Sequence, residues 1–162
     1  MKKYRYSPLT LNREIRLLKL HAGEGLKELS GELVNATLDE TPPFTAISYA
    51  WGAPQPRKAI LCSGLEMDIG PSLHSALLHL RDPADDTLLW VDALCINQKD
   101  VPELNQQVRM MGDIYAAACI TAIWLGEESD EVKMAFGWLR RFAGAAWDSM
   151  SDPDSITRNQ AE

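Results

Sequence analysis

Three short segments of the chain end in polar or aromatic residues that could bind a ligand or carry out acid–base chemistry. They are residues 44–52 (FTAISYAWG), 89–98 (LWVDALCINQ) and 120–126 (ITAIWLG). Each segment is predicted to be a buried β-strand that runs directly into these residues. In a parallel α/β sheet the C-terminal ends of the strands lie on one edge, and ligands bind there. The sequence therefore predicts one site built from the three loops that follow these strands.

Two carboxylates are the first candidates for catalysis. Asp92 comes late in an otherwise apolar predicted strand, and a buried carboxylate is costly unless it is hydrogen-bonded or paired. It is therefore either a residue of the site or a structural carboxylate that holds backbone amides. Glu103 follows Asp100 by three residues, so a capping box explains it locally, while its place near the strand ends favours a catalytic role. Both interpretations stay open for each carboxylate.

Five other residues are candidates for binding the ligand. Trp51 either stacks on a ring of the ligand or packs as a rim aromatic under the next loop. Tyr49 ends the same strand, and Gly52 is expected to supply a backbone turn that a Cβ would obstruct. Asn97 and Gln98 either hydrogen-bond a ligand or cap their own loop.

Composition disfavours several classes of protein. The 162 residues correspond to about one domain, and the net charge of −7 disfavours nucleic-acid binding, which needs a clustered basic face. No apolar run approaches the roughly 18 residues of a membrane span, and the N-terminus lacks the apolar core of a signal peptide. A cytoplasmic protein is expected.

The cysteines and glycines narrow the chemistry further. Cys62, Cys95 and Cys119 are widely spaced in apolar runs, which predicts buried free thiols and no metal site. Cys95 as a nucleophile would need a base that the sequence does not place beside it. There is no GxGxxG motif and no P-loop, so a dehydrogenase or NTPase lacks its phosphate cradle.

Strand patterns dominate the first half of the chain. Strands are predicted at residues 14–20 and 26–38, followed by residues 44–49, and a hairpin joins residues 59–62 to 65–69. The run at residues 87–96 is apolar on both faces, which is typical of a central parallel strand, and a further strand is predicted at residues 120–125.

Helical patterns alternate with these later strands. The first helix is predicted to start at Ser72 as N-cap, with an apolar stripe of Leu73, Ala76, Leu77 and Leu80. The second is predicted from Asp100 to about residue 118, with an inner face of Leu104, Val108, Met111 and Tyr115. The last spans residues 131–142, with a stripe of Val132, Phe136 and Leu139.

These elements predict an α/β fold. A mixed sheet with a parallel core is flanked by helices, and an N-terminal antiparallel hairpin completes it. Residues 1–145 are expected to form one domain, with its core at about residues 10–130. Residues 146–162 are expected to be a polar, disordered tail, and the chain is expected to be an excerpt or short relative of a longer protein.

Three blocks of the sequence resemble the HET domain, the heterokaryon-incompatibility domain of filamentous fungi. They are residues 46–52 (AISYAWG), 90–98 (WVDALCINQ) and 124–126 (WLG). Between the last two blocks the family pattern is matched by Glu103, Gln107, Val108, Met111, Ile114, Tyr115 and Ala118. The resemblance covers about residues 10–130 in the right order. Leu104 is a departure, because the family usually has arginine there.

The resemblance implies an allorecognition effector that triggers programmed cell death when unlike hyphae fuse. HET domains are also similar to TIR domains, some of which cleave NAD at the nicotinamide–ribose bond. A TIR-like layout would place the catalytic glutamate on the helix after the third strand. Glu127, Glu128 and Glu131 are therefore alternatives to Glu103 and Asp92, although an acidic first turn of a helix explains these three equally simply.

Two functions from different classes follow. The first is a self-associating effector that hydrolyses NAD as its substrate and needs no cofactor, with Trp51 stacked on the adenine or nicotinamide ring. The second is a non-catalytic module that signals through homotypic contacts; a regulatory remnant without activity is a third interpretation. NLR-type or other signalling domains are the partners expected in a longer protein, with no nucleic acid and no membrane span.

Overall fold

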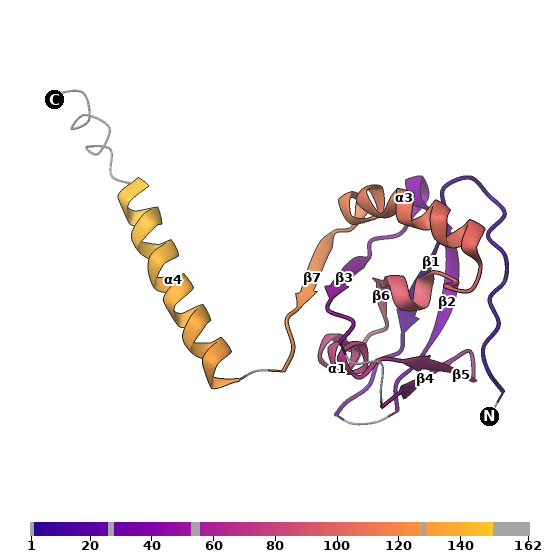
Figure 1. Cartoon of the computed structure of the whole chain (residues 1–162), viewed down its shortest axis with the longest axis horizontal. Coiled ribbons are helices and arrows are strands. Elements are labelled where there is room, and N and C mark those ends of the chain that lie inside the picture. The colour runs from indigo at the N-terminus through magenta and orange to yellow at the C-terminus, as the bar shows by residue number, and fades with distance from the viewer. Residues whose placement is uncertain (1, 26–27, 53–55, 128, 151–162) are drawn as a thin grey trace. The chain divides into compact units, whose positions relative to one another are not determined.

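The computed structural model describes residues 2–25, 28–52, 56–127 and 129–150 (Figure 1). The chain divides into two compact units, Met1–Gly126 and Glu127–Glu162. Each unit is described by itself. The first unit contains a mixed β-sheet with helices around it, and the described part of the second is a long helix.

The described residues of the first unit form seven strands and four helical segments. The strands are β1 (Glu14–Leu20), β2 (Ser30–Thr37), β3 (Thr45–Tyr49), β4 (Lys58–Cys62), β5 (Leu65–Ile69), β6 (Thr87–Trp90) and β7 (Ile120–Trp124). The helices are the 3-10 turn η1 (Leu38–Glu40), α1 (Pro71–Leu80), α2 (Asp92–Cys95) and α3 (Val101–Ala117). The second unit contains α4 (Asp130–Met150).

The strands pair in the order β5-β4-β2-β1-β6-β3-β7. β3 is parallel to both β6 and β7, whereas β1 is antiparallel to both β2 and β6. The predicted fold class, a mixed α/β sheet with a parallel part and an N-terminal antiparallel hairpin, is confirmed. The C-terminal ends of β3, β6 and β7 therefore share one edge of the sheet. The first residues of antiparallel β1 lie at that same edge.

β1 has the predicted bounds of 14–20, lies near the centre of the sheet and is buried on both faces. Ile15 and Leu17 point to one face, and Arg16 and Leu18 point to the other. All four side chains are at most 1% exposed. Burial on both faces means that other elements cover the strand on each side, which is typical of α/β sheets.

The β4–β5 hairpin is confirmed at the predicted turn. Ser63 and Gly64 have φ values of 50° and 75°, so both adopt the left-handed conformation of a two-residue type I′ turn. The predicted strand 26–38 is observed as β2 followed by η1. Residues 26–27 lie outside the described residues.

The start of α1 differs from the prediction. Gly70 is the N-cap and Pro71 is in the first turn, so the predicted cap at Ser72 is wrong. Proline suits this position because its fixed φ is already helical and its missing N–H would be unpaired there in any case. Leu73, Ala76 and Leu77 form the buried face as predicted.

The predicted strand at residues 87–96 is wrong beyond residue 90. β6 ends at Trp90, and the next residues form the single helical turn α2, which buries Leu94 and Cys95. A continuous apolar run fits either a buried strand or a buried helical turn, so periodicity alone does not separate the two. Asp92 is consequently the first residue of a short helix rather than a strand residue.

α3 begins as predicted, and the predicted inner residues Leu104, Met111 and Tyr115 are partly buried against the core, although the most buried residues of the helix are others. The Asp100 side chain accepts a hydrogen bond from the Glu103 N–H at 3.1 Å, which confirms the N-cap. The buried residues are Glu103, Gln107, Met110 and Ile114. Val108 was predicted to face inward but is 51% exposed. The prediction followed apolar side chains only, whereas two of the buried positions of α3 are polar.

β7 was predicted to be a buried strand, and it is instead an edge strand. It pairs with β3 alone in the described sheet, and its Ile120 and Ile123 side chains are 62% and 66% exposed. Cys119, just before it, is exposed, whereas Cys62 and Cys95 are buried as predicted. The prediction of a buried thiol is therefore confirmed for two of the three cysteines and wrong for Cys119.

The second unit contains a longer helix than the predicted one at residues 131–142. α4 continues to Met150, and the Phe136 and Leu139 side chains are exposed. Residues 151–162 lie outside the described residues, so the division into a domain at 1–145 and a tail at 146–162 stays a prediction. Within the described chain, no helix combines the length and the apolar character needed to cross a membrane.

Candidate functional site

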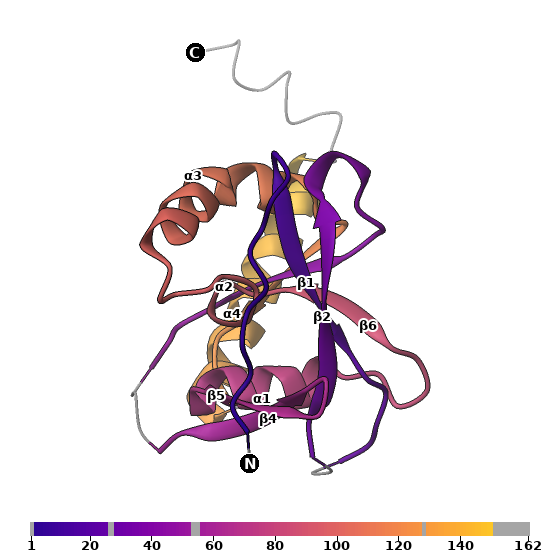
Figure 2. The same cartoon turned by 90° about the vertical axis from the view of Figure 1, so that its right-hand side faces the viewer.

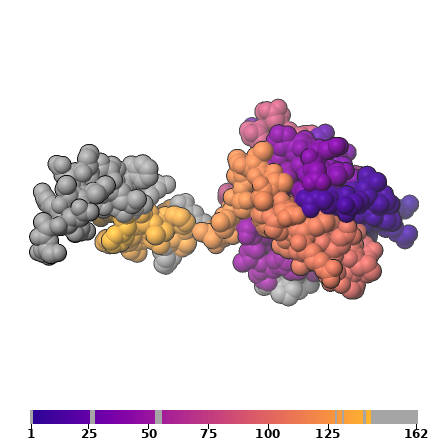
Figure 3. Space-filling view, turned by 90° about the horizontal axis from the view of Figure 1, so that it is seen from above, coloured from indigo at the N-terminus to yellow at the C-terminus, as the bar shows by residue number. Residues whose placement is uncertain are grey.

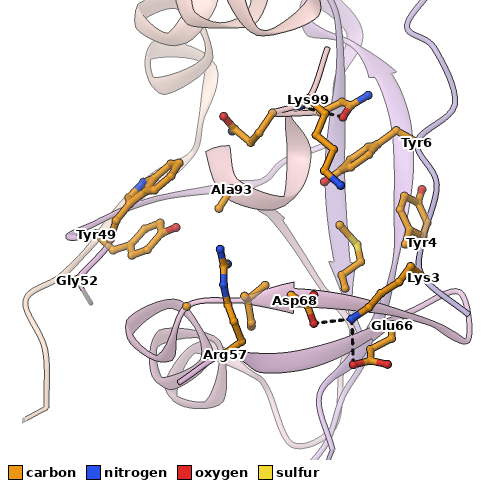
Figure 4. Close-up of a pocket in the computed structure, with 16 residues that line it drawn as sticks. Lys3, Tyr4, Tyr6, Tyr49, Gly52, Arg57, Glu66, Asp68, Ala93 and Lys99 are labelled. Atoms are coloured by element: carbon orange, nitrogen blue, oxygen red, sulfur yellow. Dashed lines mark hydrogen bonds and ion pairs between the residues drawn. The ribbon is translucent and has the colours of Figure 1, made fainter. Parts of the chain in front are cut away.

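A cleft of about 610 Å³ lies beside the edge of the sheet where β3 and β6 end (Figure 4). Four segments form its walls: the N-terminal residues 3–6, residues 49–52 after β3, residues 66–70 of β5 and its end, and residues 97–99 after α2. Figure 4 also shows Arg57 extending from the β4 side into the cleft. The cleft therefore combines segments that are spread between residues 3 and 99 of the first unit.

All five predicted ligand-binding residues line this cleft. They are Tyr49, Trp51, Gly52, Asn97 and Gln98. Gly52 has a φ of +67°, so the backbone conformation favours glycine there. The expected turn that disfavours a Cβ is therefore present, and its cause is the backbone conformation rather than a neighbour, since an added Cβ would lie 3.7 Å from the nearest side chain. That these residues bind a ligand stays a prediction.

The third predicted loop does not contribute. Residues 124–126, at the end of β7, are not among those that line the cleft. The N-terminal segment and β5 take that place, so the prediction of a site made from three strand-end loops is wrong in one loop. Trp124 instead packs against His79 of α1, with ring centroids 4.8 Å apart.

Asp92 and Trp51 meet at the rim of the cleft. Each lies two residues after the end of its strand, and the Trp51 indole N–H donates a hydrogen bond to Asp92 Oδ2 at 3.1 Å. The other oxygen, Oδ1, accepts from the Ala93 backbone N–H at 2.7 Å. The Gln98 side-chain amide donates to the Asp92 backbone carbonyl at 2.9 Å. Asp92 is not itself among the residues that line the cleft, but it contacts three that are, Trp51, Ala93 and Gln98.

The environment of Asp92 shifts the pKa of its carboxyl upward. Burial raises the pKa of this carboxyl, and the hydrogen bonds from Trp51 and Ala93 offset only part of that rise. Burial also raises the pKa of Tyr49, and the nearby charge of Asp92 adds to that rise. A half-buried carboxylate that accepts only from neutral N–H groups beside a cleft has the properties of an acid–base residue.

Glu103 lies in a different environment. Its Oε1 and Oε2 accept hydrogen bonds from the two terminal nitrogens of Arg16 at 2.6 and 3.0 Å, and Oε1 also accepts from the Asn97 N–H at 2.7 Å. Burial raises the pKa of Glu103, but the hydrogen bonds from Arg16 and Asn97 outweigh it, so the net shift is downward. Glu103 does not line the cleft. A catalytic role for it stays a prediction, and its contacts favour a structural one.

The other acidic candidates, Glu127, Glu128 and Glu131, come after the first unit in the sequence. Glu127 and Glu131 are in the second unit, which is described by itself, and nothing is described of the Glu131 side chain. Glu128 lies outside the described residues. These three alternatives stay predictions.

Thiol chemistry is disfavoured at this site. Cys95 is fully buried, and burial raises the pKa of its thiol to about 12. A thiol that stays protonated near neutral pH is a poor nucleophile. In the part of the chain that the structure describes, no group of three His, Cys, Asp or Glu residues is placed to hold a metal ion.

Sequence reasoning missed the N-terminal wall and the cations of the cleft. Lys3, Tyr4 and Tyr6 come from the first residues of the chain, and Arg57 and Lys99 lie on other walls. Lys3 Nζ lies 2.7 Å from Asp68 and 3.3 Å from Glu66, both of β5. The signal available was the alternation of basic and tyrosine residues near the N-terminus (KKYRY), since tyrosines of this kind commonly combine packing with a polar contact.

The fold and the cleft define a mixed α/β domain with a ligand-sized cleft at the C-terminal edge of its parallel strands. The model of the family "Heterokaryon incompatibility protein (HET)" matches residues 44–161 of the chain. The chain belongs to this family.

A curated relative supports the same assignment. "Heterokaryon incompatibility protein 6, OR allele" of Neurospora crassa is 33% identical over an alignment of 131 residues, and the alignment covers 72% of this chain. The same alignment covers 19% of the relative, so the chain spans only a small part of that protein's length. No solved structure matches the chain.

Proposed function

We propose that this chain is the effector part of a longer cytoplasmic protein that acts in heterokaryon incompatibility. Its cleft binds NAD and hydrolyses the nicotinamide–ribose bond, and the loss of NAD leads to cell death. Family membership supports the role in incompatibility. The observation that carries the chemistry is the hydrogen-bonded pair of Trp51 and Asp92 beside a cleft, with the pKa of Asp92 raised by burial.

The cleft fits a dinucleotide in size and lining. Its volume of about 610 Å³ lies within the range of sites for small molecules. Tyr49 and Trp51 offer aromatic faces for stacking on the bases, and Arg57 and Lys99 offer cations for the pyrophosphate. Figure 4 shows that Tyr49 and Arg57 come to the cleft from different segments.

The reaction balances with water as the second substrate. The bond between ribose C1′ and the nicotinamide nitrogen breaks, and its electron pair neutralises the charge of the pyridinium ring. A water oxygen bonds to C1′, and the proton that the water loses passes to Asp92 before it is released to solvent. The products are nicotinamide and ADP-ribose. A carboxylate at this place also stabilises the positive charge that develops on the ribose in the transition state.

The proposal is tested by incubating the chain with NAD at high protein concentration and measuring nicotinamide release. We expect release by the wild type and a loss of roughly a hundredfold or more in Asp92→Asn, which is the size of a general-base contribution. The matched control is Asp113→Asn on α3, because this exposed carboxylate pairs with Arg13 and does not line the cleft. Equal rates in Asp92→Asn and the wild type would exclude Asp92 as the base.

A non-catalytic homotypic module is the second candidate function. The exposed apolar side chains of the edge strand β7, Ile120 and Ile123, favour it, because an open strand edge can pair with another chain. An absence of nicotinamide release in both dilute and self-associated samples would favour this module over the hydrolase. Size-exclusion chromatography with light scattering gives the state of association in each sample.

A further inference from the structure

Arg16 makes four hydrogen bonds inside the first unit with its two terminal nitrogens. Nη1 donates to Glu103 Oε1 at 2.6 Å and to the Cys95 carbonyl at 3.1 Å. Nη2 donates to Glu103 Oε2 at 3.0 Å and to the Ser7 carbonyl at 2.5 Å. The Arg16 and Glu103 side chains are only 1% and 8% exposed. One guanidinium therefore joins the N-terminal segment at Ser7 to α2 and to the start of α3.

The first of these segments carries the N-terminal wall of the cleft. The guanidinium of Arg16 lies over the ring of Tyr6, 5.0 Å from its centroid, and the Tyr6 hydroxyl donates to the Leu94 carbonyl of α2 at 2.9 Å. Beyond Tyr6 the segment runs past α2 to β5, where the Tyr4 N–H donates to the Glu66 carbonyl at 3.0 Å (Figure 2).

The part of this segment that precedes β1 extends along α3. In Figure 3 the indigo N-terminal residues lie against the surface of α3, and Arg13 forms an ion pair with Asp113 at 2.7 Å. Ser7, whose carbonyl accepts from Arg16, joins this stretch to Tyr6, which is itself part of the wall of the cleft.

The segment around Glu103 holds another wall of the cleft. Glu103 Oε1 accepts from the Asn97 N–H, and the Asn97 carbonyl accepts from the Asp100 N–H at 3.0 Å. These bonds fix the loop of residues 97–99, all three of which line the cleft. Glu103 therefore sets the position of this loop without reaching the cleft itself.

We infer that Arg16 and Glu103 form a buried clamp that holds two walls of the cleft at a fixed separation, and that Glu103 is a positioning residue of the ligand site. A buried ion pair is worth little as a source of stability, but it has one well-bonded arrangement and a high cost when either partner is lost. This suits an element that fixes geometry. The identity of the ligand rests on the proposed function, whereas the clamp itself does not.

Amide hydrogen exchange on the full chain separates a clamp from a simple buried contact. The reporters are the Tyr4 N–H in the first wall and the Asp100 N–H next to the second, and neither bonds to the clamp directly. In Glu103→Gln we expect exchange at both reporters to rise by about tenfold or more, with the amides between β1 and β2 unchanged, because only the walls open.

Two further variants keep the test decisive. Arg16→Lys retains the charge but not the forked geometry that serves several acceptors, so it should loosen both walls in a protein that still folds. Gln107→Met is the matched control, because Gln107 lies one turn after Glu103, is 1% exposed, and bonds only to the Glu14 carbonyl of β1 among its described contacts. In Gln107→Met, exchange at the two reporter amides should not rise relative to exchange at the amides between β1 and β2.

The inference is overturned if Glu103→Gln and Arg16→Lys fail to raise exchange at both the Tyr4 and the Asp100 amides. It is also overturned if Gln107→Met raises exchange at these two amides as much as the clamp variants do. Titration with NAD then separates the clamp from the proposed function. We expect Glu103→Gln to raise the dissociation constant for NAD about tenfold while nicotinamide release at saturating NAD stays near the wild-type rate. Lost release at saturating NAD with unchanged exchange would make Glu103 catalytic instead. If the wild type binds no NAD, the proposed ligand is wrong and the exchange data still decide on the clamp.

Discussion

Asp92 and Glu103 both follow β6 in the sequence, but their surroundings shift the pKa values of the two carboxyl groups in opposite directions. Asp92, at the rim of the cleft, accepts hydrogen bonds from neutral N–H groups, and burial raises its pKa. Glu103, behind the wall, accepts two hydrogen bonds from a guanidinium, and its pKa is lowered despite burial. Both were candidates because they lie near strand ends. The comparison shows that the partner, more than the place, decides whether a carboxylate is free for chemistry.

The largest expected effect is the loss of the cation. Arg16→Met leaves the buried Glu103 carboxylate without its charged partner, so the free energy of unfolding should fall by about 3–5 kcal/mol. Urea unfolding followed by circular dichroism measures this. Asp113→Asn, which breaks an exposed pair, is the control and should have a much smaller effect. Equal losses in the two variants would contradict the buried clamp.

Removing both partners should cost less than removing one. Arg16→Met combined with Glu103→Leu leaves no uncompensated charge, so we expect the double variant to recover roughly 1–4 kcal/mol relative to Arg16→Met alone. The same unfolding experiment completes the cycle. Strictly additive losses would mean that the two side chains act on stability independently.

The pH dependence of stability should differ in sign between the two carboxylates. The folded-state pKa of Glu103 lies below its ordinary value of 4.5, so its contribution is present above that value and is lost as the pH falls through the folded pKa. The stability advantage of the wild type over Glu103→Gln should therefore shrink at acidic pH.

Asp92 should show the reverse trend. Its folded-state pKa lies above the ordinary value of 3.8, so the folded state binds the proton first, and stability rises as the pH falls from the folded pKa towards 3.8. As the pH falls through that range, the free energy of unfolding of the wild type should rise relative to that of Asp92→Asn. Unfolding free energies from pH 3 to 7, a range of about four units around these values, test both trends. Parallel trends would contradict the contrast between the two sites.

The smallest expected effect concerns the hydrogen bond from Trp51. Trp51→Phe keeps an aromatic ring but removes the donor to Asp92 Oδ2, a bond worth on the order of 1 kcal/mol. Because that bond lowers the pKa of Asp92, its loss should move the acidic limb of the pH–rate profile for NAD hydrolysis to higher pH. An unchanged limb would mean that Asp92 is not the group that titrates.

The sequence predicted the elements that carry the motifs better than it predicted the contacts between them. β1, the β4–β5 hairpin and the meeting of the loops after β3 and β6 follow from local patterns and from the strand-end rule. The strand predicted through Asp92 was wrong because an apolar run does not distinguish a strand from the buried turn α2.

The clamp could not be derived in the same way. Its hydrogen bonds join Arg16 to residues 79 and 87 positions later, and no periodicity encodes a contact over that distance. One signal was present, because Arg16 is a cation at an inward-facing position of an apolar strand, and a buried cation requires a partner. The sequence indicates that a partner exists but not that it is Glu103.

The most direct test of the central claim is to follow the Trp51 indole N–H by two-dimensional NMR while NAD is added to the whole chain. The signal is assigned with Trp51→Phe. If the cleft beside Asp92 is the NAD site, this resonance shifts saturably, because the indole lines the cleft and donates to Asp92. A Trp51 resonance that stays in place while NAD is bound or cleaved would contradict the account, since the ligand would then lie elsewhere.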